Sequence, residues 1–270
     1  MAEKALANLI VLEVGDRRAT AACGLLLAQA GATVIAVEPE ELPLRDKWKS
    51  RSTLLAGKLS ILCRTGAEED SALLRQAVQA ADVILFSSDI PTAYGAAVAD
   101  MISADHIVCD ITAFGADAPA ELRGWPEKLM QAVAGVADVT GAADAPPTIG
   151  DVAALEFHAG IYAAGGVLAA VRVRRRSGLV QRVDISIYEC GVNSLATYLP
   201  LHYGGKETKR AGNRHPMAAP WNAFRADNGW VLMCSAKDEH WIRLCDIMGA
   251  PELAREGKLV KLAYSDEAGQ

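Results

Sequence analysis

A single acidic residue in an apolar segment is the first candidate for chemistry. Glu156 lies in the stretch DVAALEFHAG, near the start of a long Ala-rich segment. A carboxylate in such surroundings either stabilises the first turn of a helix or is a partly buried reactive group with a perturbed pKa. His158 is two residues away, so the two side chains diverge on a helix. By themselves, the residues favour the structural role.

A short charged run forms the second candidate. Asp16, Arg17 and Arg18 follow an apolar, β-branched segment and precede an Ala- and Leu-rich one. In parallel α/β sheets, ligands bind beyond the carboxyl ends of strands, where a helix N-terminus offers free N–H groups to an anion. Two arginines add donors for phosphate or carboxylate. The alternative, which the residues alone favour, is a solvated turn whose arginines pair with surface acids.

The remaining reactive residue types show no spacing typical of a metal or redox site. The six cysteines stand singly among apolar neighbours, so we expect buried, reduced thiols. The five histidines lack metal-ligand spacing, and we expect no metal. Four arginines between 172 and 176 precede Gly178. Stabilisation of a helix C-terminus is their preferred explanation, and polyanion binding is the alternative.

Alternating apolar segments indicate the fold. Short β-branched runs predict strands at 9–14, 33–37, 59–63, 82–86, 107–111 and 181–188. Helical spacing predicts helices at 19–30, 67–81, 91–104, 126–136, 153–174 and 189–200. This alternation predicts an α/β fold, an open parallel Rossmann-like sheet with helices on both faces. No GxGxxG follows the first strand, which disfavours a nicotinamide dehydrogenase.

The last part of the chain is organised differently. Residues 206–220 are rich in Gly, Pro and charge, which predicts a linker after a first domain at 1–205. Residues 221–270 are expected to begin a smaller α+β domain, incomplete at Gln270, with one strand (WVLMCSA) and one helix (EHWIRLCDIM). The length allows one large domain and a fragment of another.

Charge and hydropathy limit the classes of partner. The net charge is -6, with acids and bases interspersed, so there is no general attraction to nucleic acid or to an anionic membrane. The N-terminus shows no signal-peptide pattern, and no uncharged apolar run approaches the roughly 18 residues of a membrane span. We expect a cytoplasmic protein without nucleic-acid or membrane partners.

Several segments, in order along the chain, resemble those of family III CoA-transferases. The opening LIVLEVGDRRATAACGLLLAQAGATVIAVEPE resembles the family's first strand, loop and helix with the following GAdVIkVE motif. Later segments are similar to the family's NRGKRSI and ITGFG motifs, its long helix with the next strand, and its entry to the small domain: AGKLSI, ITAFG, GIYAAGGVLAAVRVRRRSGLVQRVDISIYE and GNRHPMAAPWNAFRADNGWVLM.

The resemblance implies an activity and a site. In the family, a carboxylate near the start of the long helix attacks an acyl-CoA thioester, and CoA then passes through an enzyme-bound thioester to an acceptor acid. Glu156 falls on the position of the family's aspartate, which implies that it is the nucleophile. Asp16, Arg17 and Arg18 fall in the loop over the thioester and CoA, and Lys58 falls near the nucleotide phosphates. The implied ligands are coenzyme A, as acyl-CoA, and a small carboxylic acid.

The chain departs from the family in two ways that bear on its partners. It has a glutamate in place of the aspartate, and it ends before the segments that complete the large domain and cover the active site in family members. Those members form interlocked dimers. We therefore expect a homo-oligomer, such as a dimer, or a second CoA-transferase-like chain as partner.

Two alternatives stay open beside CoA transfer. One is a non-catalytic or degenerate half of a CoA-transferase assembly, which the glutamate and the early end favour. The other is an acyl-CoA racemase or isomerase of the same superfamily. That chemistry needs a proton-transferring histidine upstream of the acid, and residues 125–130 contain none.

Overall fold

The protein, seen in a computed structural model, divides into two compact units. The structure describes residues 4–39, 51–64, 68–215, 219–235 and 237–255. The first unit consists of 1–136 and 149–200, and the second of 137–148 and 201–270. The first unit ends at residue 200, whereas the sequence predicted a first domain that ends at 205. The loop 137–148 belongs to the second unit.

Six parallel strands form the sheet of the first unit. They are β1 (Ile10–Val14), β2 (Thr33–Pro39), β3 (Leu59–Cys63), β4 (Val83–Phe86), β5 (Ile107–Thr112) and β6 (Arg182–Ser186). Their order is β3-β2-β1-β4-β5-β6, with every neighbouring pair parallel, which confirms the predicted open parallel sheet. The winding reverses between β1 and β4, and α/β sheets bind ligands in the crevice outside such a reversal.

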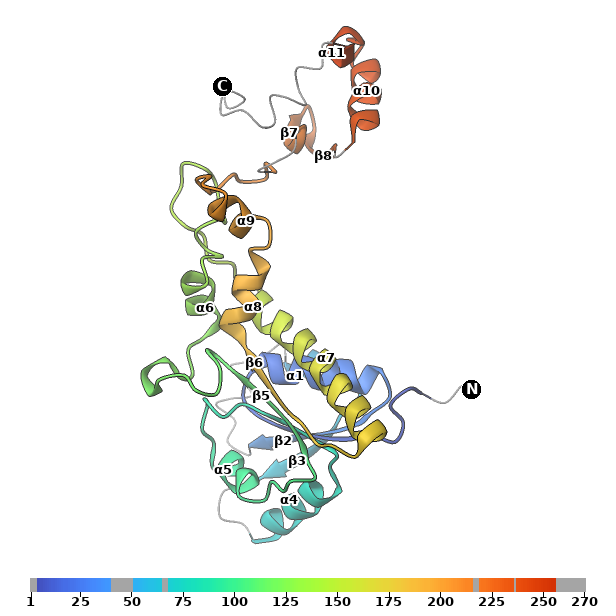
Figure 1. Ribbon diagram of the computed structural model, residues 1–270, viewed down its shortest axis with the longest axis vertical. Helices are drawn as coiled ribbons and strands as arrows, with labels where there is room; N and C mark the ends of the chain where they lie inside the picture. The colour runs from blue at the N-terminus through green and yellow to red at the C-terminus, as the bar shows by residue number, and fades with distance from the viewer. Residues whose placement is uncertain (1–3, 40–50, 65–67, 216–218, 236, 256–270) are drawn as a thin grey trace. The chain divides into compact units, whose positions relative to one another are not determined.

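Helices cover both faces of this sheet, as predicted (Figure 1). The helices α1 (Arg18–Gln29) and α7 (Ala154–Ser177) lie on one face, and α4 (Glu68–Ala80) and α5 (Ala93–Ala99) lie on the other. Side chains alternate between the faces along a strand. In β1, Val11 therefore joins the core under α1 and α7, and Leu12 joins the core under α4 and α5.

The long helix α7 approaches α1 closely. A Cβ at Gly160 would lie 2.8 Å from the carbonyl oxygen of Ala19 and 2.8 Å from the Cβ of Ala22. A glycine therefore allows this approach, and Glu156, one turn earlier on α7, faces the start of α1. The other end of α7 has Gly178 in the left-handed conformation, with φ of 75°, which agrees with the predicted helix stop.

The helix α7 is long and apolar. Among the helices that the structure describes, it alone has the length and apolar composition of a membrane span, with a mean hydropathy of 1.4 over its most apolar stretch. Half of that stretch is buried within the protein. Core helices of globular domains have the same properties, so this observation is weak evidence for a membrane span.

The remaining helices of the first unit differ partly from the predictions. The predicted helix 189–200 is two helices, α8 (Ile187–Ser194) and α9 (Tyr198–Tyr203). Pro200 explains the break, because it has no N–H to continue a helix from the preceding turn and is tolerated only in the first turn of a new one. Between β5 and α7 lie a short 3-10 helix (Ala120–Leu122) and α6 (Glu127–Val133), and the four-residue α3 (Arg51–Leu54) was too short to predict.

The second unit contains a hairpin where we predicted one strand. The strands β7 (Trp221–Ala226) and β8 (Gly229–Cys234) are antiparallel and joined by Asp227 and Asn228. The turn residues Asp-Asn-Gly are typical of a tight hairpin, so the sequence contains a signal for this turn. The helices α10 (Asp238–Ile247) and α11 (Glu252–Arg255) follow, and α10 contains most of the predicted EHWIRLCDIM helix.

Candidate active site

The carboxylate of Glu156 is buried beside the first turn of α1. Only 6% of Glu156 is exposed, and its Oε2 accepts a hydrogen bond of 3.2 Å from the backbone N–H of Ala19. Its Oε1 lies 3.8 Å from Nη1 of Arg17. The anion at the N-terminus of α1 is thus a side chain of the protein itself, and one free N–H group of the helix donates to it.

The surroundings of Glu156 change its acidity. Burial raises the pKa of the Glu156 carboxyl above its ordinary value. The positive charges of Arg17 and Arg18 and the Ala19 N–H lower this pKa, and the negative charge of Glu127 raises it further, with a net upward result. A carboxylate with a raised pKa is more basic than an ordinary one, which suits a nucleophile or a proton acceptor.

Glu127 holds the N-terminus of α7, where Glu156 lies. Its carboxylate accepts the backbone N–H groups of Leu155 at 3.0 Å and of Glu156 at 2.9 Å. These are groups that a capping side chain normally satisfies, but the residue before α7 is Ala153, whose methyl side chain cannot accept a hydrogen bond. Gln131 steadies the carboxylate by donating to its Oε1 at 2.8 Å. Glu127 was not predicted from the sequence, although an alanine at the N-cap implied a hydrogen-bond acceptor from elsewhere in the chain.

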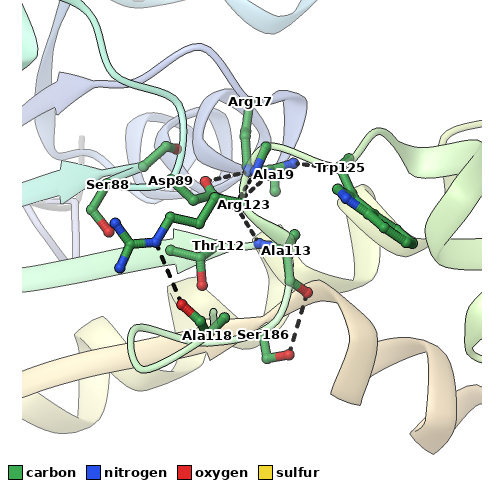
Figure 2. A network of polar contacts seen from close by, with 12 residues as sticks. Arg17, Ala19, Ser88, Asp89, Thr112, Ala113, Ala118, Arg123, Trp125 and Ser186 are labelled. Atoms are coloured by element: carbon green, nitrogen blue, oxygen red, sulfur yellow. Dashed lines mark hydrogen bonds and ion pairs between the residues drawn. The ribbon is translucent and has the colours of Figure 1, made fainter. Parts of the chain in front are cut away.

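Arg17 is the basic residue that the structure brings nearest to Glu156. Its guanidinium is bidentate to Asp89, with Nε to Oδ1 at 3.0 Å and Nη2 to Oδ2 at 2.5 Å. The third nitrogen, Nη1, donates to the carbonyl oxygen of Trp125 at 3.4 Å and faces Glu156. Figure 2 shows Arg17 and Asp89 at the centre of this network. The buried pair contradicts the alternative of a solvated turn for Arg17.

Asp89 joins several loops at the carboxyl edge of the sheet. It follows β4, and its Oδ2 also accepts the backbone N–H of Ala113, after β5, at 2.7 Å (Figure 2). The same oxygen accepts the backbone N–H of Gly124 at 3.3 Å. With Arg17 from the loop after β1, three loops meet at one carboxylate. Asp89 was not predicted as a site residue, because its partners lie 24 or more residues away along the chain.

The other predicted site residues have different surroundings. Asp16 and Arg18 are half-buried on either side of Arg17. The amine of Lys58 is enclosed on the other side of α1, 2.5 Å from Oε2 of Glu13 and 2.8 Å from the carbonyl oxygen of Ala21. The predicted contact of Lys58 with CoA phosphates requires these bonds to change, and it stays a prediction.

The buried thiols are weaker candidate nucleophiles than Glu156. All six thiols are free, and Cys234 alone is exposed. Burial raises the pKa of Cys109 to about 12 and that of Cys190 to about 11, so these thiols stay protonated at neutral pH. Within the described residues, no three His, Cys, Asp or Glu side chains gather as metal ligands would.

The first unit is a parallel α/β domain with a buried carboxylate and arginines beside the switch point of its sheet, which is where sheets of this class bind ligands. Residues 6–268 match the family model of CoA-transferase family III. The chain belongs to this family.

Characterised relatives in the same family are CoA-transferases. The succinyl-CoA:mesaconate CoA-transferase of Haloarcula marismortui is 31% identical over 278 residues, which cover 93% of this chain and 69% of that protein. The succinyl-CoA–D-citramalate CoA-transferase of Chloroflexus aurantiacus is 32% identical over 91% of this chain and 65% of its own length. The chain thus spans about two thirds of the length of the curated relatives that it matches.

Solved structures show the same fold. A CAIB/BAIF family protein from Brucella suis is similar with a TM-score of 0.77 and 26% identity, over 96% of this chain and 73% of that one. A hypothetical protein from Mycobacterium tuberculosis has a TM-score of 0.76 and 22% identity, over 99% of this chain and 77% of that one.

Proposed function

We propose that this chain transfers coenzyme A from an acyl-CoA donor to a carboxylic acid acceptor, with Glu156 as the covalent nucleophile. The observation that carries the proposal is the buried carboxylate with a raised pKa beside the switch point of the sheet. Family membership supplies the reaction class.

The proposed reaction begins with two exchanges at the Glu156 carboxyl. An oxygen of Glu156 attacks the thioester carbonyl, the C–S bond breaks, and CoA leaves as a thiolate with a mixed anhydride behind it. The thiolate attacks the Glu156 carbonyl of this anhydride. The donor's acid leaves as a carboxylate, and Glu156 holds CoA as a thioester.

The acceptor then reverses these two steps. Its carboxylate attacks the Glu156 thioester and releases the CoA thiolate, which forms a second mixed anhydride. The thiolate attacks the acceptor's carbonyl carbon, so that acyl-CoA leaves and the Glu156 carboxylate is restored. Each turnover therefore leaves one oxygen of the acceptor on Glu156.

The residues around Glu156 supply positioning and charge. The Ala19 N–H and the N-terminus of α1 direct a partial positive charge at the reacting carboxyl, and Glu127 fixes the backbone from which that carboxyl projects. Burial keeps water away from the intermediates, which hydrolyse readily. The side chain of a glutamate is one methylene longer than that of an aspartate. The close approach of α1 and α7 at Gly160 fixes the distance between the backbone of Glu156 and the start of α1.

The ligands of the site follow from the same proposal. Asp16, Arg17 and Arg18 border the thioester and CoA, and Lys58 contacts the nucleotide part after releasing Glu13. The relatives' names point to succinyl-CoA as the first donor to test. The proposed partner is a second copy of this chain or a related CoA-transferase chain.

A second candidate function is supported by the hydrogen bonds of Glu156. Its carboxylate accepts the Ala19 N–H and lies near Arg17, so it could serve only to join α7 to α1. The chain would then be the non-catalytic half of a CoA-transferase assembly.

Trapping with hydroxylamine separates the two candidates. The protein is incubated with succinyl-CoA and hydroxylamine, and its peptides are analysed by mass spectrometry. Hydroxylamine attacks an anhydride or thioester and leaves a hydroxamate on the residue that carried it. We expect a hydroxamate at Glu156, and none there in the Glu156→Gln variant. No hydroxamate at Glu156 with succinyl-, acetyl- or formyl-CoA would support the non-catalytic role.

A further inference from the structure

The guanidinium of Arg17 lies between two buried carboxylates but bonds unequally to them. The side chain of Arg17 is 2% exposed and that of Asp89 is 5% exposed. Asp89 takes the bidentate fork of Nε and Nη2, whereas Glu156 faces only Nη1 at 3.8 Å, beyond hydrogen-bonding distance. The strongest charge-assisted contact of Arg17 is thus made away from the proposed nucleophile.

We propose that Asp89 is a positioning residue for Glu156, which keeps Arg17 from forming a full ion pair with the Glu156 carboxylate and so leaves that carboxylate free to attack. This inference rests on the proposed function of Glu156. Nucleophilic attack uses an oxygen lone pair. A carboxylate held by both donors of a guanidinium fork has those lone pairs engaged and its charge stabilised in the ground state.

Hydrogen bonds from the backbone hold Asp89 in the position from which it binds Arg17. The N–H groups of Ala113 and Gly124 bond to the same oxygen that receives Nη2 of Arg17. Asp89 is therefore held by two backbone N–H groups of the segment between β5 and α6, and Figure 2 shows Ala113 and Arg17 beside it. To turn its fork toward Glu156, Arg17 would have to leave a carboxylate that is already anchored.

The charge of Asp89 has a second effect on the same site. Arg17 and Arg18, at the start of α1, are the cations that act on Glu156, and Glu127 on α6 is the nearby anion. His158, on α7 itself, is exposed and lies 3.0 Å from the Ser194 hydroxyl on α8. We expect the carboxylate of Asp89, which is bidentate to Arg17, to offset the charge of Arg17 within this group. Without it, Arg17 would stabilise the ionised form of Glu156 more strongly.

The Asp89→Asn variant tests the inference. Asparagine keeps the size and a carbonyl acceptor but removes the charge. The titration of Glu156 is followed by the ¹³C signal of its carboxyl carbon, identified by its absence in Glu156→Gln. We expect the midpoint to move to lower pH, and hydroxamate formation from succinyl-CoA to slow about tenfold or more.

A double variant distinguishes positioning from a purely structural role. Arg17→Gln combined with Asp89→Asn removes both charges and keeps side chains that can bond to each other. Because the cation that lowers the pKa of Glu156 is then gone, we expect its midpoint to move above that of the wild type. A purely structural role gives no reason for the two variants to shift in opposite directions. If Asp89→Asn does not fold, Asp89→Ser takes its place, because serine also removes the charge and keeps an oxygen acceptor, and the same downward shift of the midpoint is expected.

Asp70→Asn is the matched control. Asp70 also accepts an arginine fork and a backbone N–H, both from Arg64, but it lies on α4 on the other face of the sheet. It should leave the titration of Glu156 unchanged. The inference is overturned if Asp89→Asn leaves the titration midpoint of Glu156 unchanged and the rate of hydroxamate formation within about twofold of the wild-type rate. A wild type that forms no hydroxamate contradicts the proposed function instead, whereas the titration still measures the effect of Asp89 on Glu156.

Discussion

At the scale of single residues, the site depends on a carboxylate that is buried without being neutralised by a close partner. Glu156 has one hydrogen bond from a backbone N–H and one arginine nitrogen at 3.8 Å. An ordinary buried acid of a structural pair would have a bidentate contact of the kind that Asp89 has. Two acids beside one arginine thus have separate roles: Asp89 binds Arg17, and Glu156 keeps a raised pKa.

The raised pKa of Glu156 predicts how stability changes with pH. Between the ordinary value of 4.5 and the higher folded value, the folded protein binds a proton that the unfolded chain has lost. The free energy of unfolding therefore falls as pH rises through this interval. We expect urea denaturation at several pH values to show this decline in the wild type and a weaker one in Glu156→Gln. Equal slopes in the two proteins would show that Glu156 titrates normally.

Residue types alone could not decide the role of Glu156. Its apolar neighbours and its place near a helix start suited a structural acid, and only the resemblance to a family suggested a nucleophile. The structure adds the burial and the position beside α1. Asp89 and Glu127 were not predicted, because their partners are brought together by the sheet and not by spacing along the chain.

At the scale of elements, the contact between α1 and α7 sets the position of the nucleophile. Gly160 lets the helices approach until a Cβ there would lie 2.8 Å from Ala19. The N–H of that same Ala19 bonds to Glu156. The contact at Ala19 therefore sets both the distance between α1 and α7 and the surroundings of the Glu156 carboxylate.

Two glycines of α7 give a matched test of this contact. In Gly160→Ala, the new methyl group must push α1 and α7 apart, so we expect a loss of about 1–3 kcal/mol in the free energy of unfolding and slower trapping at Glu156. In Gly165→Ala, a Cβ meets nothing within 4 Å, and the better helix former should add about 0.5–1 kcal/mol. Urea denaturation measures both. Similar effects of the two substitutions would contradict a special role of Gly160.

The strands were predicted more accurately than the helices. β-Branched runs in a parallel sheet are buried on both faces, so their ends were located to within two residues for all six strands. Helix ends depend on local bonds, such as the cap from Ser186, whose hydroxyl accepts the Glu189 N–H at 3.2 Å and starts α8 before the predicted residue. Only the second strand of the hairpin in the second unit was predicted. The first strand, WNAFRA, shows little alternation of apolar and polar residues.

At the scale of the whole molecule, the first unit contains a sheet, its switch point and the residues around Glu156. Glu156 and the residues that contact it, including Arg17, Ala19 and Glu127, all lie in this unit. The relatives are about half as long again as this chain. A complete CoA-transfer cycle by this chain is a proposal that rests on the residues of the first unit and on family membership.

Transfer of an oxygen isotope tests the central claim most directly. The protein is incubated with succinyl-CoA and succinate labelled with ¹⁸O in both carboxyl groups, and the peptide that contains Glu156 is analysed by mass spectrometry. Because the acceptor leaves one of its oxygens on the nucleophile, we predict ¹⁸O at Glu156 and no incorporation in Glu156→Gln. Transfer of CoA to labelled succinate without ¹⁸O at Glu156 would contradict the account.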